Sequence, residues 1–333
     1  MAELSIDNDP ARVDALFNDA DAVSFPGWNA HPLYGDFGQA LGAAVNAERG
    51  AYTACPFAVV DGDEVLLLAG ATAGSGSISG FGQPLALGLR AELGKKRRKR
   101  AFALAFDHLR ALAAEHGADT IRILGADSGS ALGETDLACL DQQARPEAHI
   151  HGIVDATQTE AEIHSALRDS YRSLVNWGRR QLHLQYVNAD NPDRDLFDQY
   201  PAFHARIAGG SKYGAAYWDV FWREITAGRG ELGLGFIEDG QLVTGTLTID
   251  AGSTTYYTSG VYEREMFDKP LGHFPVFDAI LRAGERGTRV FDLGEIFPAG
   301  AAEEKEVQIG FFKKGFTSTF QLRTHWLVDA SAS

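Results

Sequence analysis

The segments FAVVDGDEVLLLAG, at residues 57–70, and LGFIEDGQLVTGTLTID, at residues 234–250, share one pattern. In each, two apolar runs flank an Asp-Gly pair, Asp61-Gly62 in the first and Asp239-Gly240 in the second. Asp-Gly between apolar runs is a strong signal for the tight turn of a β-hairpin. The sequence therefore predicts one hairpin in each half of this 333-residue chain.

The same order of elements follows both hairpins. The tripeptides QPL (83–85) and KPL (269–271) lead toward amphipathic helices. The segments AFALAFDHLRALAAEHGADTIRILGA (101–126) and HFPVFDAILRAGERGTRVFDLGE (273–295) then share a Phe-Asp pair, a glycine that can cap a helix and a final Leu-Gly. This repetition favours duplication; chance similarity stays the alternative, because Asp-Gly turns and leucine-rich helices are common.

We therefore expect an α/β (α+β) chain of two lobes, each with a mixed central sheet flanked by helices and related to the other by internal duplication. The first lobe is expected to span residues 1–150. The second is expected to span 151–316 and to carry the chemistry. Residues 317–333 are a candidate to pack back on the first lobe.

Composition narrows the class of protein. No stretch of about 18 apolar residues and no basic, apolar leader occurs, so we expect a cytoplasmic protein without a membrane span. Cys55 and Cys139 lack ligand spacing, so neither a disulfide framework nor a metal site is expected. The formal net charge of -15 disfavours broad binding to DNA or to anionic membranes.

One run of cations departs from this acidic background. It is either the solvated start of a surface helix or a local phosphate-binding patch for tRNA or another polyanion. Its members are Lys95, Lys96, Arg97, Arg98, Lys99 and Arg100.

Several motifs occur in an order that resembles the FemAB/FemX-like aminoacyltransferases, a family of paired GNAT-like domains. The motifs are LRDSYRSLVNWGRR (167–180), FHARIAGGSKYG (203–214), KPLGHF (269–274), FDLGE (291–295) and IGFFKKGF (309–316), with SFPGWNAHP (24–32) in the first half. The resemblance covers most of residues 150–320. The Phe-Lys motif after the FDLG strand is its most specific part.

This resemblance implies transfer of an amino acid from an aminoacyl-tRNA ester to an amine, commonly on a cell-wall precursor. Some two-lobed relatives acylate amino groups on nucleotide-linked sugars. We therefore expect an acyltransferase that uses aminoacyl-tRNA, or acyl-CoA, as a co-substrate and holds no tightly bound cofactor. The alternatives are an acyl-CoA-dependent N-acyltransferase acting on a nucleotide-linked amino sugar, and a noncatalytic binding protein.

Amine acylation gathers negative charge on a carbonyl oxygen, which a positioned cation stabilises. Lys313, which matches the family's Phe-Lys motif, is the candidate for this cation, with Phe312 shaping the pocket and Lys314 contacting phosphate. The alternative is a pair of solvated lysines beside a core phenylalanine. Asp292, at a strand end, is a candidate to accept a proton from the amine, or instead to orient Lys313 or cap a helix.

Arg168 and Arg172 are four residues apart, so on a helix both could bind one phosphate or carboxylate of the substrate. Salt bridges to the chain's many acids are the alternative. We expect these arginines to converge with Phe312 and Lys313 on a single pocket.

The segment KPLGHF occupies the place of the GNAT loop that binds the pyrophosphate of CoA, which makes Lys269, Gly272 and His273 candidates for donor binding. Lysine replaces the initial Arg or Gln of that loop, and Phe274 replaces its final small residue, which disfavours tight CoA binding. A plain Pro-Gly turn that enters a helix is the alternative.

The remaining candidates are aromatic or imidazole side chains. His204 and His273 have suitable pKa values for a base, although a structural role is commoner for either. Tyr256 and Tyr257 alternate on a strand, so one should face the site and the other the core. By family analogy Trp28 lines the acceptor site, with a place in the core as the alternative.

Overall fold

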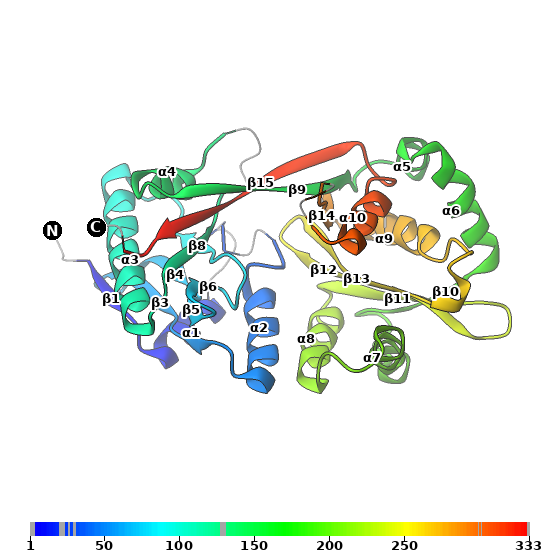
Figure 1. Ribbon diagram of the computed structural model, residues 1–333, viewed down its shortest axis with the longest axis horizontal. Helices are drawn as coiled ribbons and strands as arrows, with labels where there is room; N and C mark the ends of the chain where they lie inside the picture. The colour runs from blue at the N-terminus through cyan, green and yellow to red at the C-terminus, as the bar shows by residue number, and fades with distance from the viewer. Residues whose placement is uncertain are drawn as a thin grey trace. The chain divides into compact units, whose positions relative to one another are not determined.

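The computed structural model describes residues 4–19, 24–25, 27–28, 31–126, 131–298, 300 and 302–331. The chain divides into two compact units, and each combines sheet and helices (Figure 1). The first contains residues 1–149 and 322–333, and the second contains residues 150–321. The α/β fold class with two lobes is confirmed. The second unit extends five residues beyond the expected end at 316.

The first unit is built on a sheet with the strand order β1-β3-β4-β7 and on a second group of strands, β15-β8-β6-β5-β2. The hairpin predicted at 57–70 is confirmed, because β3 and β4 pair antiparallel around Asp61-Gly62. The bounds of the strands are β1 (Ser5–Asp7), β2 (Thr53–Ala54), β3 (Phe57–Asp61), β4 (Glu64–Ala69), β5 (Thr72–Gly74), β6 (Ser77–Ser79), β7 (Leu87–Leu89), β8 (Thr120–Leu124) and β15 (Thr319–Asp329).

One long helix covers the core of the first unit. The apolar positions Ala105, Phe106 and Leu109 of α3 (Lys95–His116) are fully buried in a cluster with residues of β3, β4 and β8. The helix ends at Gly117, whose φ of 64° closes it in the left-handed conformation that glycine favours. The other helices are α1 (Pro10–Asp19), α2 (Asp36–Arg49) and α4 (Glu134–Asp141).

In the second unit, one sheet runs in the order β10-β11-β12-β13-β14-β9. The hairpin predicted at 234–250 is confirmed, since β11 and β12 pair antiparallel on either side of Asp239-Gly240. All neighbours in this sheet are antiparallel except β13 and β14. The bounds are β9 (Arg145–Asp155), β10 (His183–Val187), β11 (Gly230–Phe236), β12 (Leu242–Ala251), β13 (Thr254–Tyr262) and β14 (Val290–Glu295).

Helices pack on both faces of this sheet (Figure 1). Helix α9 covers β11 and β12 on one face, while α7 and α8 cover the other. On the α7 face the sheet has a glycine at 245, and the ring of Tyr200 fills the space that a side chain there would take. The bounds are α5 (Glu160–Ala166), α6 (Asp169–Gln181), α7 (Arg194–Ala208), α8 (Ala215–Thr226), α9 (His273–Glu285), α10 (Glu304–Lys313) and a 3-10 turn at Arg264–Met266. No helix in the described part of the chain is both long and apolar enough to cross a bilayer.

The parallel pair β13 and β14 stays together over only part of its length. Thr254–Tyr256 pair with Val290–Asp292, whereas the two strands continue to Tyr262 and Glu295. Beyond Tyr256 and Asp292 the strands therefore no longer share hydrogen bonds. This divergence lies at the carboxyl ends of the paired segments.

We predict that Asp136→Ala destabilises the first unit by about 2 kcal/mol or more, because it removes the acceptor of three hydrogen bonds. The buried carboxylate accepts from Trp326 Nε1 of β15 at 2.7 Å and from the backbone of Ala126 and Gly133. Urea unfolding measures the loss. The control is Asp141→Ala on the same helix, where only a 3.6 Å ion pair with Lys99 is lost; a change within about 0.5 kcal/mol is expected there.

Candidate active site

The Lys313 side chain lies at the C-terminal end of α10 and is partly buried. Its Nζ donates a hydrogen bond to the backbone oxygen of Glu295, at the end of β14, over 3.0 Å. At Gly310 helix α10 lies against Ile296 and Phe297, where an added Cβ would make ordinary van der Waals contacts of 3.4 to 3.5 Å. The site therefore joins the end of one helix to the end of one strand.

Burial lowers the pKa of the Lys313 ammonium from its ordinary value of 10.5 to about 8, because the charged form is less well solvated there. The neighbouring carboxylates of Asp292 and Glu295 act in the opposite direction and raise it. At neutral pH the side chain is consequently a cation, but one that loses its proton at a pH far below that of a solvated lysine.

Gly294 brings the ammonium close to the backbone of β14. Its φ of 84° is in the left-handed region, and a Cβ added to it would lie 2.8 Å from Lys313 Nζ and 3.4 Å from the Tyr256 hydroxyl oxygen. Lysine and tyrosine thus approach the same glycine, next to the point where β13 and β14 diverge.

The carboxylate of Asp292 is fully buried. Its oxygens lie 2.9 and 3.0 Å from His151 Nδ1, and Oδ1 also accepts from Gly294 N at 2.6 Å. This placement leaves the proton-acceptor role of Asp292 a prediction, because the carboxylate is buried and already engaged by His151 and Gly294. It agrees with the alternative, in which Asp292 orients the surroundings of Lys313.

Phe312 is packed among aromatic rings rather than exposed to ligand. Its neighbours are Tyr171, Tyr262, His273 and Phe316, with ring centroids 5.1 to 6.2 Å away. Tyr171 also donates its hydroxyl to the Phe312 carbonyl oxygen at 3.2 Å. Phe312 therefore fixes the last turn of α10, which carries Lys313.

The two tyrosines of β13 point to different environments. Tyr256 lies beside Gly294, as described above. Tyr257 packs against the core cluster of the second unit, and its hydroxyl is 2.7 Å from that of Tyr262. Burial raises the pKa of Tyr257 well above its ordinary value, and the neighbouring Tyr262 raises it further. Only Tyr256 is placed near the Lys313 ammonium.

Arg168 and Arg172 do not share a helix face, so the helical spacing on which their joint binding of an anion was predicted is wrong. Residues 167 and 168 are extended and separate α5 from α6, which makes Arg168 the residue before the helix. Arg168 stacks on the Phe311 ring at 4.1 Å and donates to the Phe311 carbonyl oxygen. Arg172 instead donates to the Ser165 carbonyl oxygen at 2.6 Å and pairs with Asp169.

The segment KPLGHF forms a tight turn into α9. The amides of Leu271 and His273 donate to carbonyl oxygens of Lys269 and Pro270 within the segment. A Cβ at Gly272 would lie 2.7 Å from the Tyr262 ring, so the space is filled from inside the protein. Lys269 pairs with Asp268 at 2.9 Å, and burial lowers the pKa of His273. This turn presents fewer free amides than a pyrophosphate cradle requires.

Three further candidates differ in their surroundings. Trp28 is 1% exposed and donates Nε1 to Asp36 at 2.6 Å, so it belongs to the core of the first unit and does not line an acceptor site. His204 packs among the rings of Tyr200, Tyr213 and Trp218, and burial lowers its pKa. Lys314 is exposed at the end of α10.

The basic run forms the first turns of α3, and half of it is neutralised locally. Arg97 pairs with Asp61 and Glu64. Arg98 pairs with Glu134, and Lys99 with Asp141. Within the described residues no ion pair involves Lys95, Lys96 or Arg100, which remain available to a polyanion.

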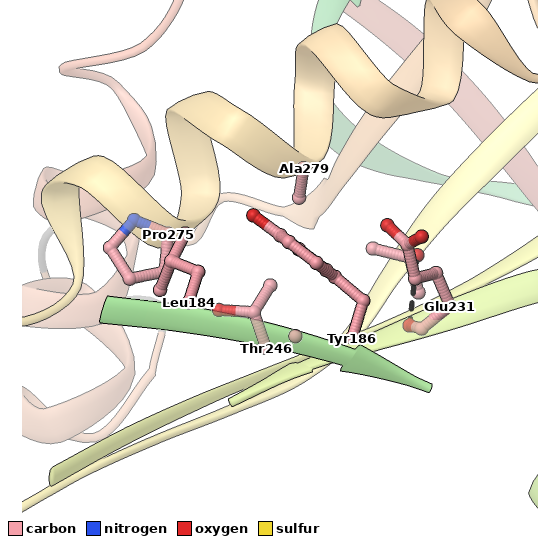
Figure 2. A pocket seen from close by; sticks show the side chains of 8 residues that line it. Leu184, Tyr186, Glu231, Thr246, Pro275 and Ala279 are labelled. Carbon is pink, nitrogen blue, oxygen red and sulfur yellow. Dashed lines mark hydrogen bonds between the residues drawn. The ribbon is translucent and has the colours of Figure 1, made fainter. Parts of the chain in front are cut away.

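Each unit contains a cavity. One, of about 10 Å³, lies between α9 and strands β10 to β12 and has room for about one water molecule (Figure 2). In it Tyr186 and Glu231 face the helix, and Tyr186 donates to Asp278 at 2.5 Å. The other, of about 260 Å³ in the first unit, is lined in part by His31, Arg323 and Leu124-Gly125. Leu124-Gly125 is the counterpart of Leu293-Gly294 in the repeat.

His151 is the residue of the site that sequence reasoning missed. It lies in β9, outside every motif, and only the pairing of β9 with β14 brings it to Asp292. Among the described residues no group of three or more His, Cys, Asp or Glu side chains could hold a metal ion.

Comparison with solved structures identifies the fold. The chain is similar to the crystal structure of FemX, with a TM-score of 0.67 and 15% identity over 98% of this chain and 97% of FemX. It is also similar to a tandem GNAT protein from the clavulanic acid biosynthesis pathway, with a TM-score of 0.57 and 16% identity over 99% and 100% of the two chains. The chain has the tandem GNAT fold.

A third tandem GNAT relative in structure is L-PGS from Bacillus licheniformis, with a TM-score of 0.60 and 12% identity over 98% of this chain and 93% of that chain. The fold implied by the FemAB/FemX resemblance is thus confirmed. No protein-family model and no curated protein sequence matches the chain.

We predict that Gly294→Ala raises the pKa of Lys313 from about 8 toward its ordinary value, because the new methyl group pushes the ammonium out of its partly buried position. Competitive acetylation with acetic anhydride across pH, with mass spectrometry of the peptide containing Lys313 and Lys314, measures that pKa. Lys314 is the internal reference.

The matched control is Gly287→Ala. Gly287 has a φ of 90° but no atom within 4 Å of an added Cβ. Both variants should therefore lose about 1 to 2 kcal/mol from the left-handed backbone. Only Gly294→Ala should move the titration of Lys313, and an equal change in both variants would contradict the geometry.

Proposed function

We propose that this chain is an N-acyltransferase that moves an aminoacyl group from aminoacyl-tRNA to the amine of a small or nucleotide-linked acceptor. The observation that supports it best is the partly buried Lys313 ammonium beside Gly294, where β13 and β14 diverge in a tandem GNAT fold. Because aminoacyl-tRNA is made in the cytoplasm, the proposal implies a cytoplasmic reaction.

In this reaction the neutral amine of the acceptor attacks the ester carbonyl carbon. A C–N bond forms and the carbonyl oxygen becomes an alkoxide. When the alkoxide collapses, the C–O bond to the tRNA ribose breaks, and the proton lost by the amine balances the one gained by the leaving oxygen. Lys313 neutralises the alkoxide, an effect that is large in a site partly withdrawn from water.

The other residues of the site support this cation. Asp292 and Glu295 contribute negative charge that keeps Lys313 protonated. Phe312 anchors the last turn of α10. Tyr256, whose hydroxyl shares the surroundings of Gly294 with Lys313, is the second candidate to contact the substrate carbonyl.

Two features favour tRNA over CoA as the donor. The turn before α9 uses the amides of Leu271 and His273 internally, which leaves a poor cradle for a pyrophosphate. Arg168, stacked on the exposed Phe311, and the cations Lys95, Lys96 and Arg100 are suited to phosphates of a larger polyanion.

An acyl-CoA-dependent N-acyltransferase acting on a nucleotide-linked amino sugar is the second candidate. It is favoured by the structural similarity to the tandem GNAT protein from the clavulanic acid biosynthesis pathway. Three results together would decide for acyl-CoA as the donor: saturable thermal stabilisation by CoA, consumption of acyl-CoA, and no reaction of charged tRNA.

We predict that Lys313→Met lowers transfer by about 10²- to 10³-fold, the effect of losing one oxyanion donor. The assay uses total tRNA charged with labelled amino acids and follows label into alkali-stable amide on a panel of amines. The panel includes a lysine-containing peptide, a nucleotide-linked peptide and a nucleotide-linked amino sugar.

Lys314→Met is the control, because it removes a lysine of the same helix end that is exposed. Its rate should stay within about threefold of wild type if Lys314 makes a single phosphate contact. Wild-type rates for Lys313→Met, or no transfer by the unaltered protein from either donor, would instead favour a noncatalytic binding protein.

We also predict that the transfer rate falls as pH rises through about 8, because Lys313 loses its proton there and no longer stabilises the alkoxide. Rates are measured between pH 6 and 10 after subtraction of uncatalysed ester hydrolysis. In Lys313→Arg the side chain keeps its charge between pH 6 and 10. The fall in the transfer rate of this variant should therefore move above pH 10. A falling limb at the same pH in Lys313→Arg would exclude Lys313 as its source.

A further inference from the structure

His151 is a buried histidine that contacts the surroundings of Lys313 from a neighbouring strand. It is 3% exposed and lies in β9, where its Nδ1 faces both oxygens of the Asp292 carboxylate at 2.9 and 3.0 Å. Asp292 is itself fully buried. An imidazole N–H and a carboxylate at this distance form a charge-assisted hydrogen bond in which Nδ1 is the donor.

The contact spans an irregularity in β14. Asp292 pairs with Ile153 of β9, and Glu295 pairs with His151, so three steps along β14 match two steps along β9. The extra residue is accommodated at Gly294, whose N–H donates to Asp292 Oδ1 at 2.6 Å. The Asp292 carboxylate thus closes the bulge by binding the N–H of Gly294. His151, on the facing strand, binds the same carboxylate.

The same bulge provides the immediate surroundings of Lys313. Glu295, the residue opposite His151, offers the backbone oxygen that accepts from Nζ. The ionisable groups around the ammonium are Asp292 and Glu295 of β14, Tyr256 of β13 and His151 behind Asp292, with Lys314 next along the helix. If the bulge changes, the hydrogen-bond acceptor and the negative charge beside Lys313 change together.

We propose that His151 is a positioning residue, which holds Asp292 so that the β14 bulge stays closed and the Lys313 ammonium stays charged beside Gly294. Its effect on the reaction rests on the proposed function; its effect on Lys313 does not. His151 itself contacts no substrate in this role, because it is buried behind Asp292.

Removing the imidazole should act on Lys313 through Asp292. A buried carboxylate that loses a hydrogen-bond donor is less stable as an anion, so Asp292 takes up a proton or turns away. Either change removes negative charge from the neighbourhood of the ammonium. Since that charge raises the pKa of Lys313, the pKa should fall further below its present value of about 8.

The test is competitive acetylation of Lys313 across pH in full-length variants, with Lys314 as the internal reference. His151→Ala and Asp292→Asn should each lower the pKa of Lys313 by about 1, the effect of losing one nearby opposite charge. His151→Asn, whose amide can occupy the position of Nδ1 and donate to Asp292, should keep the pKa close to that of the wild type. The double variant His151→Ala/Asp292→Asn should match Asp292→Asn alone, because His151 acts through that carboxylate.

Two results would overturn the proposal. One is an unchanged Lys313 titration in a folded His151→Ala variant. The other is a double variant that lowers the pKa of Lys313 clearly beyond Asp292→Asn. If His151→Ala fails to fold, His151→Asn decides: a folded protein with a lowered pKa of Lys313 contradicts the proposal, and a retained pKa supports it.

The titration needs neither donor nor acceptor, so it separates this inference from the proposed function. If transfer is found, His151→Ala should lower kcat and shift the falling limb of the pH profile to lower pH, with KM little changed. A merely structural role would leave that limb in place. If no transfer is found with any donor, the titration still shows whether His151 controls Lys313.

Discussion

The ammonium group of Lys313 is partly withdrawn from water, and a cation can be kept there only if the protein supplies acceptors and opposite charge. One short stretch of β14 supplies both. The carbonyl oxygen of Glu295 accepts the hydrogen bond, and Asp292 contributes a buried negative charge. The arrangement of α10, β13 and β9 around this stretch can be understood as support for that single cation.

The support comes from three directions in the second unit. Aromatic packing around Phe312 fixes the end of α10, and Tyr171 binds its carbonyl oxygen. The register between β13 and β14 ends at Asp292, before Gly294. Strand β9, which pairs with β14, places His151 beside Asp292. A left-handed glycine in the middle allows lysine and tyrosine to approach the backbone closely.

Local sequence signals predicted the parts of this architecture that depend on local geometry. Asp-Gly pairs located both hairpins. What depends on pairing between distant strands could not be predicted: no local pattern distinguishes His151 from any other strand histidine, and the bulge at Gly294 shows only in the register. Arg168 and Arg172 were misplaced because the extended residues at 167–168 interrupt an otherwise continuous helical pattern.

Strand β15 has a consequence for the order in which the chain can fold. Trp326 and Val328, near the C-terminus, are buried in the core that contains Phe57 and Phe106. During synthesis the ribosome releases these residues only after the whole of the second unit has emerged. Until then the first unit lacks its final strand, and its partly formed core exposes apolar surface. Nascent chains stalled before residue 322 should therefore depend on chaperones.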